Sequence, residues 1–134
     1  MANSLFDRGR QAFLDAEVSW STDNIKLVIT DHTDVTPSVS ASEDLADISA
    51  GTVATSGNFV GKAVTDGIAD ATDVPLTAVT GDAADSISIY FDTGTAGTSL
   101  LLVFIDTATG LPVTPNGGDI TIAWDSGTNK IFKL

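Results

Sequence analysis

Alternating hydrophobic and polar residues run through most of the chain and predict short β-strands. A period of two places every second side chain on the same face of a sheet. The alternation is clearest in SISIYF at residues 86–91 and in ITIAW at residues 120–124, which we expect to be half-buried antiparallel strands. The run LLLVFI at residues 100–105 does not alternate. We therefore expect it in the middle of a sheet, with both of its faces covered.

Turn-forming Gly, Pro and Asn residues separate the predicted strands. We expect strands at residues 24–30, 52–55, 59–65, 69–78, 85–92, 99–106, 119–124 and 130–133, and one short helical turn at residues 42–48 that Ser42 caps. Many short strands with frequent turns are typical of a sandwich or a barrel. We predict a mainly β chain that forms an antiparallel β-sandwich or a jelly-roll-like barrel.

The first segment has the only helical pattern. We expect a short N-terminal α-helix or arm over residues 1–17, with Asn3 or Ser4 as its N-cap and a β-sandwich over residues 18–134. Gly9 in its middle weakens a helix by up to about 1 kcal/mol, so contact with the sandwich has to supply the difference. The apolar side chains that return at helical spacing, and that need a partner surface, are Leu5, Phe6, Phe13 and Leu14.

Length and charge narrow the class of protein. The 134 residues fit a single domain. Cysteine is absent, which excludes disulfides and thiolate metal sites. The formal net charge of −12 disfavours binding to nucleic acid and to anionic membranes. The longest apolar run is far shorter than the ~20 residues that cross a bilayer, and charged residues interrupt the N-terminus before a signal peptide could form.

Candidate catalytic groups are few. His32 is the only histidine, and Asp31 and Asp34 lie beside it in a turn. A Ser–His–Asp triad could draw its members from distant positions, but no Gly-x-Ser-x-Gly motif is present. Two carboxylates could also form the catalytic pair of a glycosidase, and only their geometry would distinguish such a pair from ordinary surface residues. We interpret His32 as a turn residue and the chain as a protein without enzymatic activity.

Metal and cofactor sites are also weakly indicated. Asp66, Asp70 and Asp73 offer the oxygen ligands that calcium prefers. Their spacing matches no EF-hand loop, and a period of two places Asp73 on the side opposite to the other two. We interpret them as turn carboxylates and expect no metal or cofactor.

The basic residues gather near the two ends of the chain, around an acidic middle. No Lys or Arg lies between Lys62 and Lys130. Apolar residues accompany the terminal cations, which is unusual for free chain ends. We predict that both ends contact a partner or a second subunit, through Leu5, Phe6, Arg8, Arg10, Phe13, Trp20, Lys130, Phe132 and Lys133.

Two long runs resemble a known family. They are MANSLFDRGRQAFL at residues 1–14 and TATGLPVTPNGGDITIAWD at residues 107–125, which is followed by KIFKL at residues 130–134. Together they resemble small virion proteins of tailed bacteriophages, which are read as capsid decoration or cement proteins. The resemblance implies a homotrimer on the outside of the mature capsid that binds the major capsid protein and bridges capsomers. It also implies synthesis in the host cytoplasm and a final place in the virion.

Two other functions stay open. A head–tail connector or tail-associated protein would also be a small β protein, and copy number per particle separates it from a decoration protein. A carbohydrate-binding module would use Trp20, Trp124 and Tyr90 as stacking platforms for sugar rings.

Overall fold

The computed structural model describes residues 3–134. In chain order, these residues form β1 (Ser4–Leu5), α1 (Asp7–Leu14), β2 (Ile25–Thr30), the 3-10 helix η1 (Leu45–Gly51), β3 (Thr52–Thr55), β4 (Ala63–Thr65), β5 (Ile68–Asp70), β6 (Val74–Leu76), β7 (Ser86–Phe91), the 3-10 helix η2 (Ala96–Thr98), β8 (Leu101–Ile105), β9 (Ile120–Ile122) and β10 (Phe132–Lys133). The fold is mainly β with antiparallel sheets, as predicted. It is sandwich-like, and its described strands close into no barrel.

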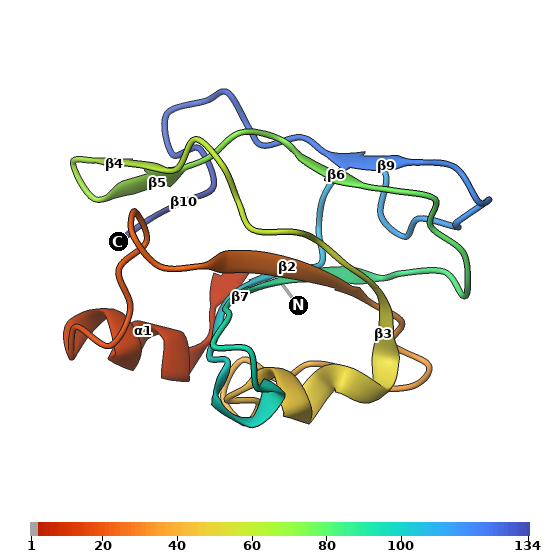
Figure 1. The fold of residues 1–134 in the computed structure, drawn as a ribbon, viewed down its shortest axis with the longest axis horizontal. Helices are drawn as coiled ribbons and strands as arrows, with labels where there is room; N and C mark the ends of the chain where they lie inside the picture. Colours follow the sequence, from red (N-terminus) through yellow and green to blue (C-terminus); the bar gives the residue numbers. More distant parts are fainter. Residues whose placement is uncertain (1–2) are drawn as a thin grey trace.

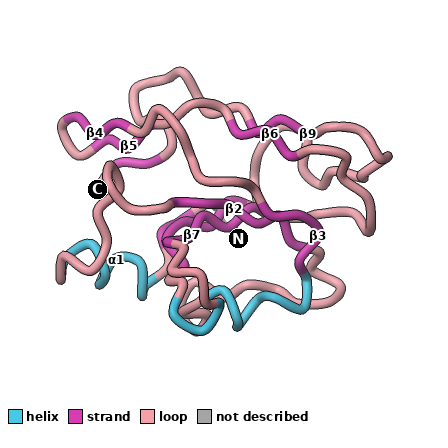
Figure 2. The backbone as a smooth tube through the Cα atoms, viewed as in Figure 1, coloured by secondary structure: helices cyan, strands magenta, loops and turns pink. Residues whose placement is uncertain are grey.

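The strands and helices form three layers (Figure 1). The central sheet has five strands in the order β1-β8-β7-β2-β3. On one side lies the outer layer, which consists of the three-stranded sheet β10-β5-β4 and the two-stranded sheet β6-β9. On the other side lies the helical layer, made of α1, η1 and η2 with their connecting loops. Figure 2 shows that loops make up much of both covering layers, whereas the central sheet is continuous.

The central strands are buried on both faces because a layer covers each of them. β8 has four fully or almost fully buried residues, as expected for a run without alternation. The prediction of a half-buried strand is wrong for β7, where Ser86 and Ser88 are buried as completely as Ile89. In β9 the predicted alternation holds, since Thr121 is exposed between two partly buried isoleucines.

Each side of the central sheet has its own hydrophobic cluster. Toward the outer layer, Leu27, Ile89 and Leu102 belong to the larger cluster. Toward the helical layer, Val28, Tyr90 and Phe104 belong to a second cluster, together with Ile48 of η1 and Phe6. The Phe6 and Phe104 rings lie edge to face with centroids 5.9 Å apart, which is a favourable arrangement of two aromatic rings.

The N-terminal segment differs from the predicted helix. Ser4 lies in β1, and α1 begins only after Phe6, which caps it without a side-chain hydrogen bond. Phe6 is 0% exposed, whereas Leu14 is 87% exposed. The predicted apolar face is therefore wrong, because half of it precedes the helix and Leu14 faces away from the core.

Gly9 is the point at which α1 touches the central sheet. A Cβ atom there would lie 2.7 Å from the Leu101 carbonyl oxygen and 2.7 Å from the Leu102 Cα. Real Cβ atoms do not approach backbone that closely. The missing side chain, which costs helix stability, lets α1 pack directly against β8.

The middle of the chain is less regular than predicted. The segment expected as a strand at residues 59–65 is extended only in β4, and the one expected at residues 69–78 is divided into β5 and β6. The helical turn has its N-cap two residues later than expected. Asp44, not Ser42, is its N-cap, and Asp47 completes a capping box with it.

Gly9→Ala should destabilise the protein by about 1–3 kcal/mol, because the new methyl group forces α1 away from β8. Gly57→Ala is the control, since nothing lies within 4 Å of a Cβ atom at Gly57. Urea unfolding of both variants measures the difference. A stabilisation by Gly9→Ala, as helix propensity alone requires, would show that this close contact is not formed.

Candidate functional site

The two ends of the chain meet at a groove between the central sheet and the outer layer. We call it the terminal groove. Its volume is about 980 Å³. One wall is formed by Leu5 of β1 and Val103 of β8, and the other by residues 120–125 and 130–133. The loop at residues 107–111 also borders it. β1 and β8 reach this groove because they form one edge of the central sheet.

Five of the predicted contact residues line the terminal groove: Leu5, Arg10, Lys130, Phe132 and Lys133. They come from opposite ends of the sequence. The Phe13 and Phe132 rings connect the two ends directly, with centroids 5.7 Å apart. Phe13 is partly buried against the larger cluster.

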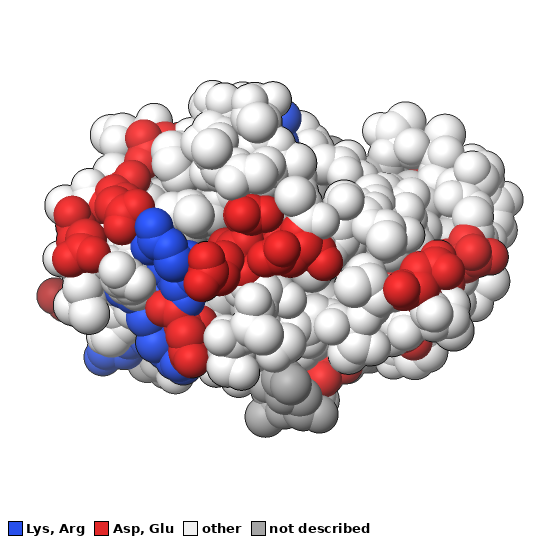
Figure 3. All heavy atoms as spheres, turned by 90° about the horizontal axis from the view of Figure 1, so that it is seen from below, with Lys and Arg blue, Asp and Glu red and all other residues white. Residues whose placement is uncertain are grey.

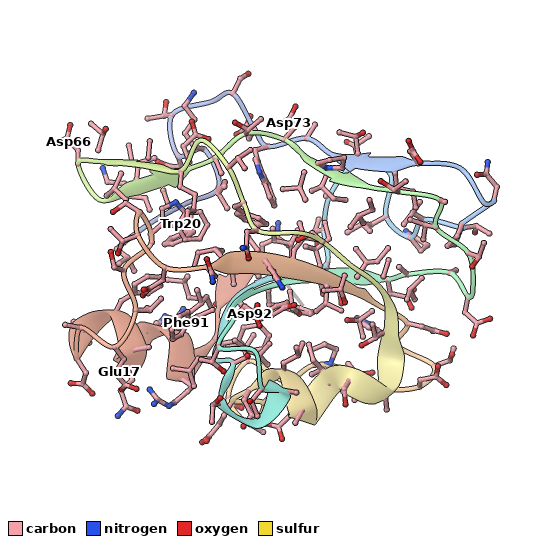
Figure 4. The ribbon with its side chains drawn as sticks, viewed as in Figure 1. Glu17, Trp20, Asp66, Asp73, Phe91 and Asp92 are labelled. Atoms are coloured by element: carbon pink, nitrogen blue, oxygen red, sulfur yellow. The ribbon has the colours of Figure 1, made fainter. Side chains whose placement is uncertain are left out.

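Phe6 and Trp20 have a different position from the one predicted for contact residues. Trp20 is 4% exposed, and in Figure 4 its side chain lies inside the molecule between the outer layer and the central sheet. Its indole N–H donates to the Asp70 carbonyl oxygen at 3.0 Å. Its ring packs edge to face on Phe59 and on Phe132. Both residues are core residues, and their side chains are not available to a partner at the surface.

The two arginines of α1 are each held by a carboxylate. Arg8 donates two hydrogen bonds to Glu17, at 3.1 and 2.7 Å. This pairing lowers the pKa of Glu17 and raises the pKa of Arg8. Arg10 donates to Asp7 at 2.9 Å and to the Ser4 hydroxyl at 3.0 Å. Arg8 does not border the terminal groove, whereas Arg10 does.

The two lysines of the groove differ from the arginines in their ion pairing. Within residues 3–134, neither Lys130 nor Lys133 takes part in an ion pair. Lys130 donates only a long bond of 3.4 Å, to the Ser126 carbonyl oxygen. The groove therefore offers two ammonium groups that can pair with a negative ligand.

Sequence reasoning missed most of the apolar wall. Ile105, Leu111 and Val113 line the groove and are partly exposed. Ile120 and Ile122 join them from β9. The alternation at residues 120–124 predicted a half-buried strand but not which surface its apolar side would share with the N-terminal segment.

His32 is less exposed than a free turn residue. Its Nε2 lies 2.8 Å from the Ser86 hydroxyl oxygen, and its ring stacks on Phe104 with centroids 6.2 Å apart. Its backbone N–H donates to Asp85 at 2.8 Å. Ser86 is 0% exposed, so its hydroxyl is closed to a substrate, and the pair fixes the turn after β2 onto β7.

The carboxylates considered for calcium do not come together. Asp66 lies at the tip of the β4–β5 turn, away from Asp73 (Figure 4). Asp70 accepts a hydrogen bond from the Ala71 N–H, and Asp73 accepts one from the Trp124 N–H. The Asp70 bond is local, whereas the Asp73 bond joins the segment before β6 to the segment after β9.

A different set of three aspartates does lie close together. Oxygens of Asp31, Asp34 and Asp82 lie within 4.8 Å of one another. Asp31 is already satisfied by Thr33, whose backbone N–H and hydroxyl donate to it at 2.8 Å. These bonds lower the pKa of the Asp31 carboxyl. The cluster is a concentration of negative charge at the end of β2.

The aromatic residues considered for carbohydrate form no common platform. Tyr90 is 2% exposed, and Trp20 is in the core. Burial raises the pKa of Tyr90 to about 12. Trp124 is partly exposed, but its ring packs against Phe59 and its N–H donates to the Thr72 carbonyl oxygen.

Charge is distributed unevenly over the surface. Seen from the helical layer, most of the visible Lys and Arg atoms gather at the α1 end, while Asp and Glu form separate clusters along the face (Figure 3). No helix in the described part of the chain is long and apolar enough to cross a membrane.

No protein-family model matches the chain, and no curated protein matches it.

Ser86→Ala should destabilise the protein by about 1 kcal/mol, because the hydrogen bond to His32 is lost. Ser88→Ala is the matched variant on the same strand. Within residues 3–134 its buried hydroxyl has no hydrogen-bond partner, so removing it should leave the stability unchanged or raise it slightly. Thermal unfolding compares the two, and equal losses would contradict these assignments.

Proposed function

We propose that this chain is a structural virion protein of a tailed bacteriophage, which decorates the outside of the mature capsid and stabilises it. The proposal combines the resemblance of the terminal runs with the terminal groove. The observation that carries it is the convergence of both ends of the chain on one groove. Three of the six basic residues border that groove, namely Arg10, Lys130 and Lys133.

The terminal groove has the composition of a contact surface. Its apolar side chains would gain free energy when a partner removes them from water. Its cations would select a negative partner and speed the encounter. The acidic remainder of the surface would stay in solvent and keep many copies soluble at high local density. This division of the surface favours a protein that acts by binding.

A bound decoration protein stabilises the closed shell by mass action, because it adds binding free energy to the assembled state alone. If each homotrimer bridges neighbouring capsomers, its contacts with the major capsid protein have to break together, so individually weak contacts suffice. The trimer needs an interface between copies, and that interface remains part of the proposal.

A head–tail connector or tail-associated protein is the second candidate function. The same groove could hold a neck or tail partner, because its chemistry does not depend on which shell protein it meets. The two candidates differ in symmetry and therefore in copy number per particle.

Quantitative mass spectrometry of virions from the phage that encodes this chain tests the proposal. We expect on the order of hundreds of copies per particle for a decoration protein. About six or twelve copies would instead identify a neck or tail component. Complete absence from the virion would overturn both candidates.

Particles assembled without the chain should release DNA at a lower temperature than complete particles, because the added binding free energy is missing. Adding back the purified protein should restore the release temperature. The whole chain has to be omitted in this experiment, since a truncation of residues 1–14 would also remove β1 and the buried Phe6. Identical release temperatures would contradict a stabilising role.

A further inference from the structure

The outer layer presents an open strand edge at the terminal groove. Within residues 3–134, β9 pairs with β6 alone, and Thr121 lies opposite Pro75 in that ladder. Proline has no N–H, so the hydrogen bonds of this ladder are made by the flanking pairs, Val74 with Ile122 and Leu76 with Ile120. In an antiparallel ladder the intermediate residue directs its N–H and C=O to the other side. No described strand pairs with this side of Thr121, so its backbone can accept a further strand.

A second edge of the same kind lies at β10. Its last ladder bond joins the Leu134 N–H to the Gly67 carbonyl oxygen at 2.9 Å. Lys133 is the next residue inward, opposite Ile68. By the same alternation, its N–H and C=O point away from β5. Both Thr121 and Lys133 line the terminal groove.

The floor beside these edges is apolar and incompletely covered. Ile105 and Phe132 are partly buried residues that pack against the larger cluster and still line the groove. Leu5 adds to them from β1, which forms the other wall and is only two residues long. An extended segment on the β9 edge would place every second side chain on this floor. The remaining side chains would point outward.

The charges at the rim determine which segment fits. Lys130 and Lys133 belong to no ion pair within the described residues. Arg10 is the third cation at the groove, and it is already paired with Asp7. Asp125 is the acidic residue that lines it. The rim is thus positive on a chain whose net charge is −12. A second copy of so acidic a chain is repelled as a whole, whereas a short acidic segment meets only the rim.

We propose that the terminal groove binds one extended segment of the partner protein, in which apolar and acidic residues alternate, by adding it as a strand to the free edge of β9. Main-chain hydrogen bonds to Thr121 provide the docking, apolar side chains fill the floor, and carboxylates pair with the lysines of the rim. The identification of the partner as the capsid protein rests on the proposed function, but the chemistry of the segment does not.

Selection from a display library of random decapeptides tests the groove without any capsid. The bait is the full-length purified protein. We expect enriched peptides to alternate apolar and acidic residues. Lys130→Gln combined with Lys133→Gln should weaken their binding about tenfold. Lys26→Gln combined with Lys62→Gln is the control, because it removes the same charge from outside the groove and should leave binding within about twofold.

The strand edge needs a separate variant. Thr121→Pro removes the N–H that points away from β6 without removing a bond of the ladder, and it should abolish peptide binding. Thr121→Val keeps the N–H and should bind as the natural protein does. Thermal midpoints of all variants are measured alongside, so that a loss of binding is interpreted only for a folded protein. Amide hydrogen exchange at Thr121 in the natural protein gives a readout without substitution, and the peptide should slow it.

The outcomes separate this proposal from the proposed function. No enrichment, enrichment of basic peptides, or unchanged exchange at Thr121 in a bound complex overturns strand addition at the groove. Cosedimentation of the natural protein with capsids is scored independently. If capsid binding survives Thr121→Pro, the decoration role stands and strand addition at β9 is overturned. Peptide binding without capsid binding supports strand addition and overturns the decoration role.

Discussion

The burial of the central sheet on both faces is the constraint on which the rest of the structure depends. A sheet with two apolar faces needs a covering layer on each side. The chain supplies one layer from α1, η1 and η2 and the other from β4, β5, β6, β9 and β10. Neighbouring residues of one strand serve different clusters, as Leu27 and Val28 do. Removing either cover would expose the hydrophobic cluster on that side of the sheet.

The terminal groove lies where the two covering layers end. The helical cover contacts the β8 backbone closely at Gly9, and β1 pairs with β8 at the edge of the central sheet. The opposite cover consists of short strands and loops, and its last strands stop at open edges. The interior is therefore incompletely closed along one side. Part of the apolar surface there remains available to another chain, and this is the physical basis of both proposals.

The sequence predicted the strands better than their environments. β2, β3 and β8 lie where apolar runs placed them, because a short apolar run between turn residues has few alternatives. The burial of Ser86 and Ser88 was not predictable, since it depends on a helical layer contributed by distant segments. Local rules also favoured Ser4 as a helix cap, but pairing with β8 draws Ser4 into a strand.

The contact residues show the same limit. Terminal cations and apolar residues were recognisable as a group, and Arg10, Lys130 and Lys133 do border one groove. A pattern of residue types does not tell which aromatic residues close the core and which remain at the surface. Phe6 and Trp20 were therefore misplaced, and the isoleucines of β9 were overlooked.

The cluster of Asp31, Asp34 and Asp82 at the end of β2 has a consequence for the solvent conditions that suit this molecule. Three carboxylates within 4.8 Å repel one another, and dissolved salt at physiological strength screens such repulsion beyond about 8 Å and weakens it at shorter range. Added sodium chloride should therefore weaken this repulsion. The same ions would screen the attraction between the groove lysines and the acidic segment proposed above, so added salt should weaken that binding.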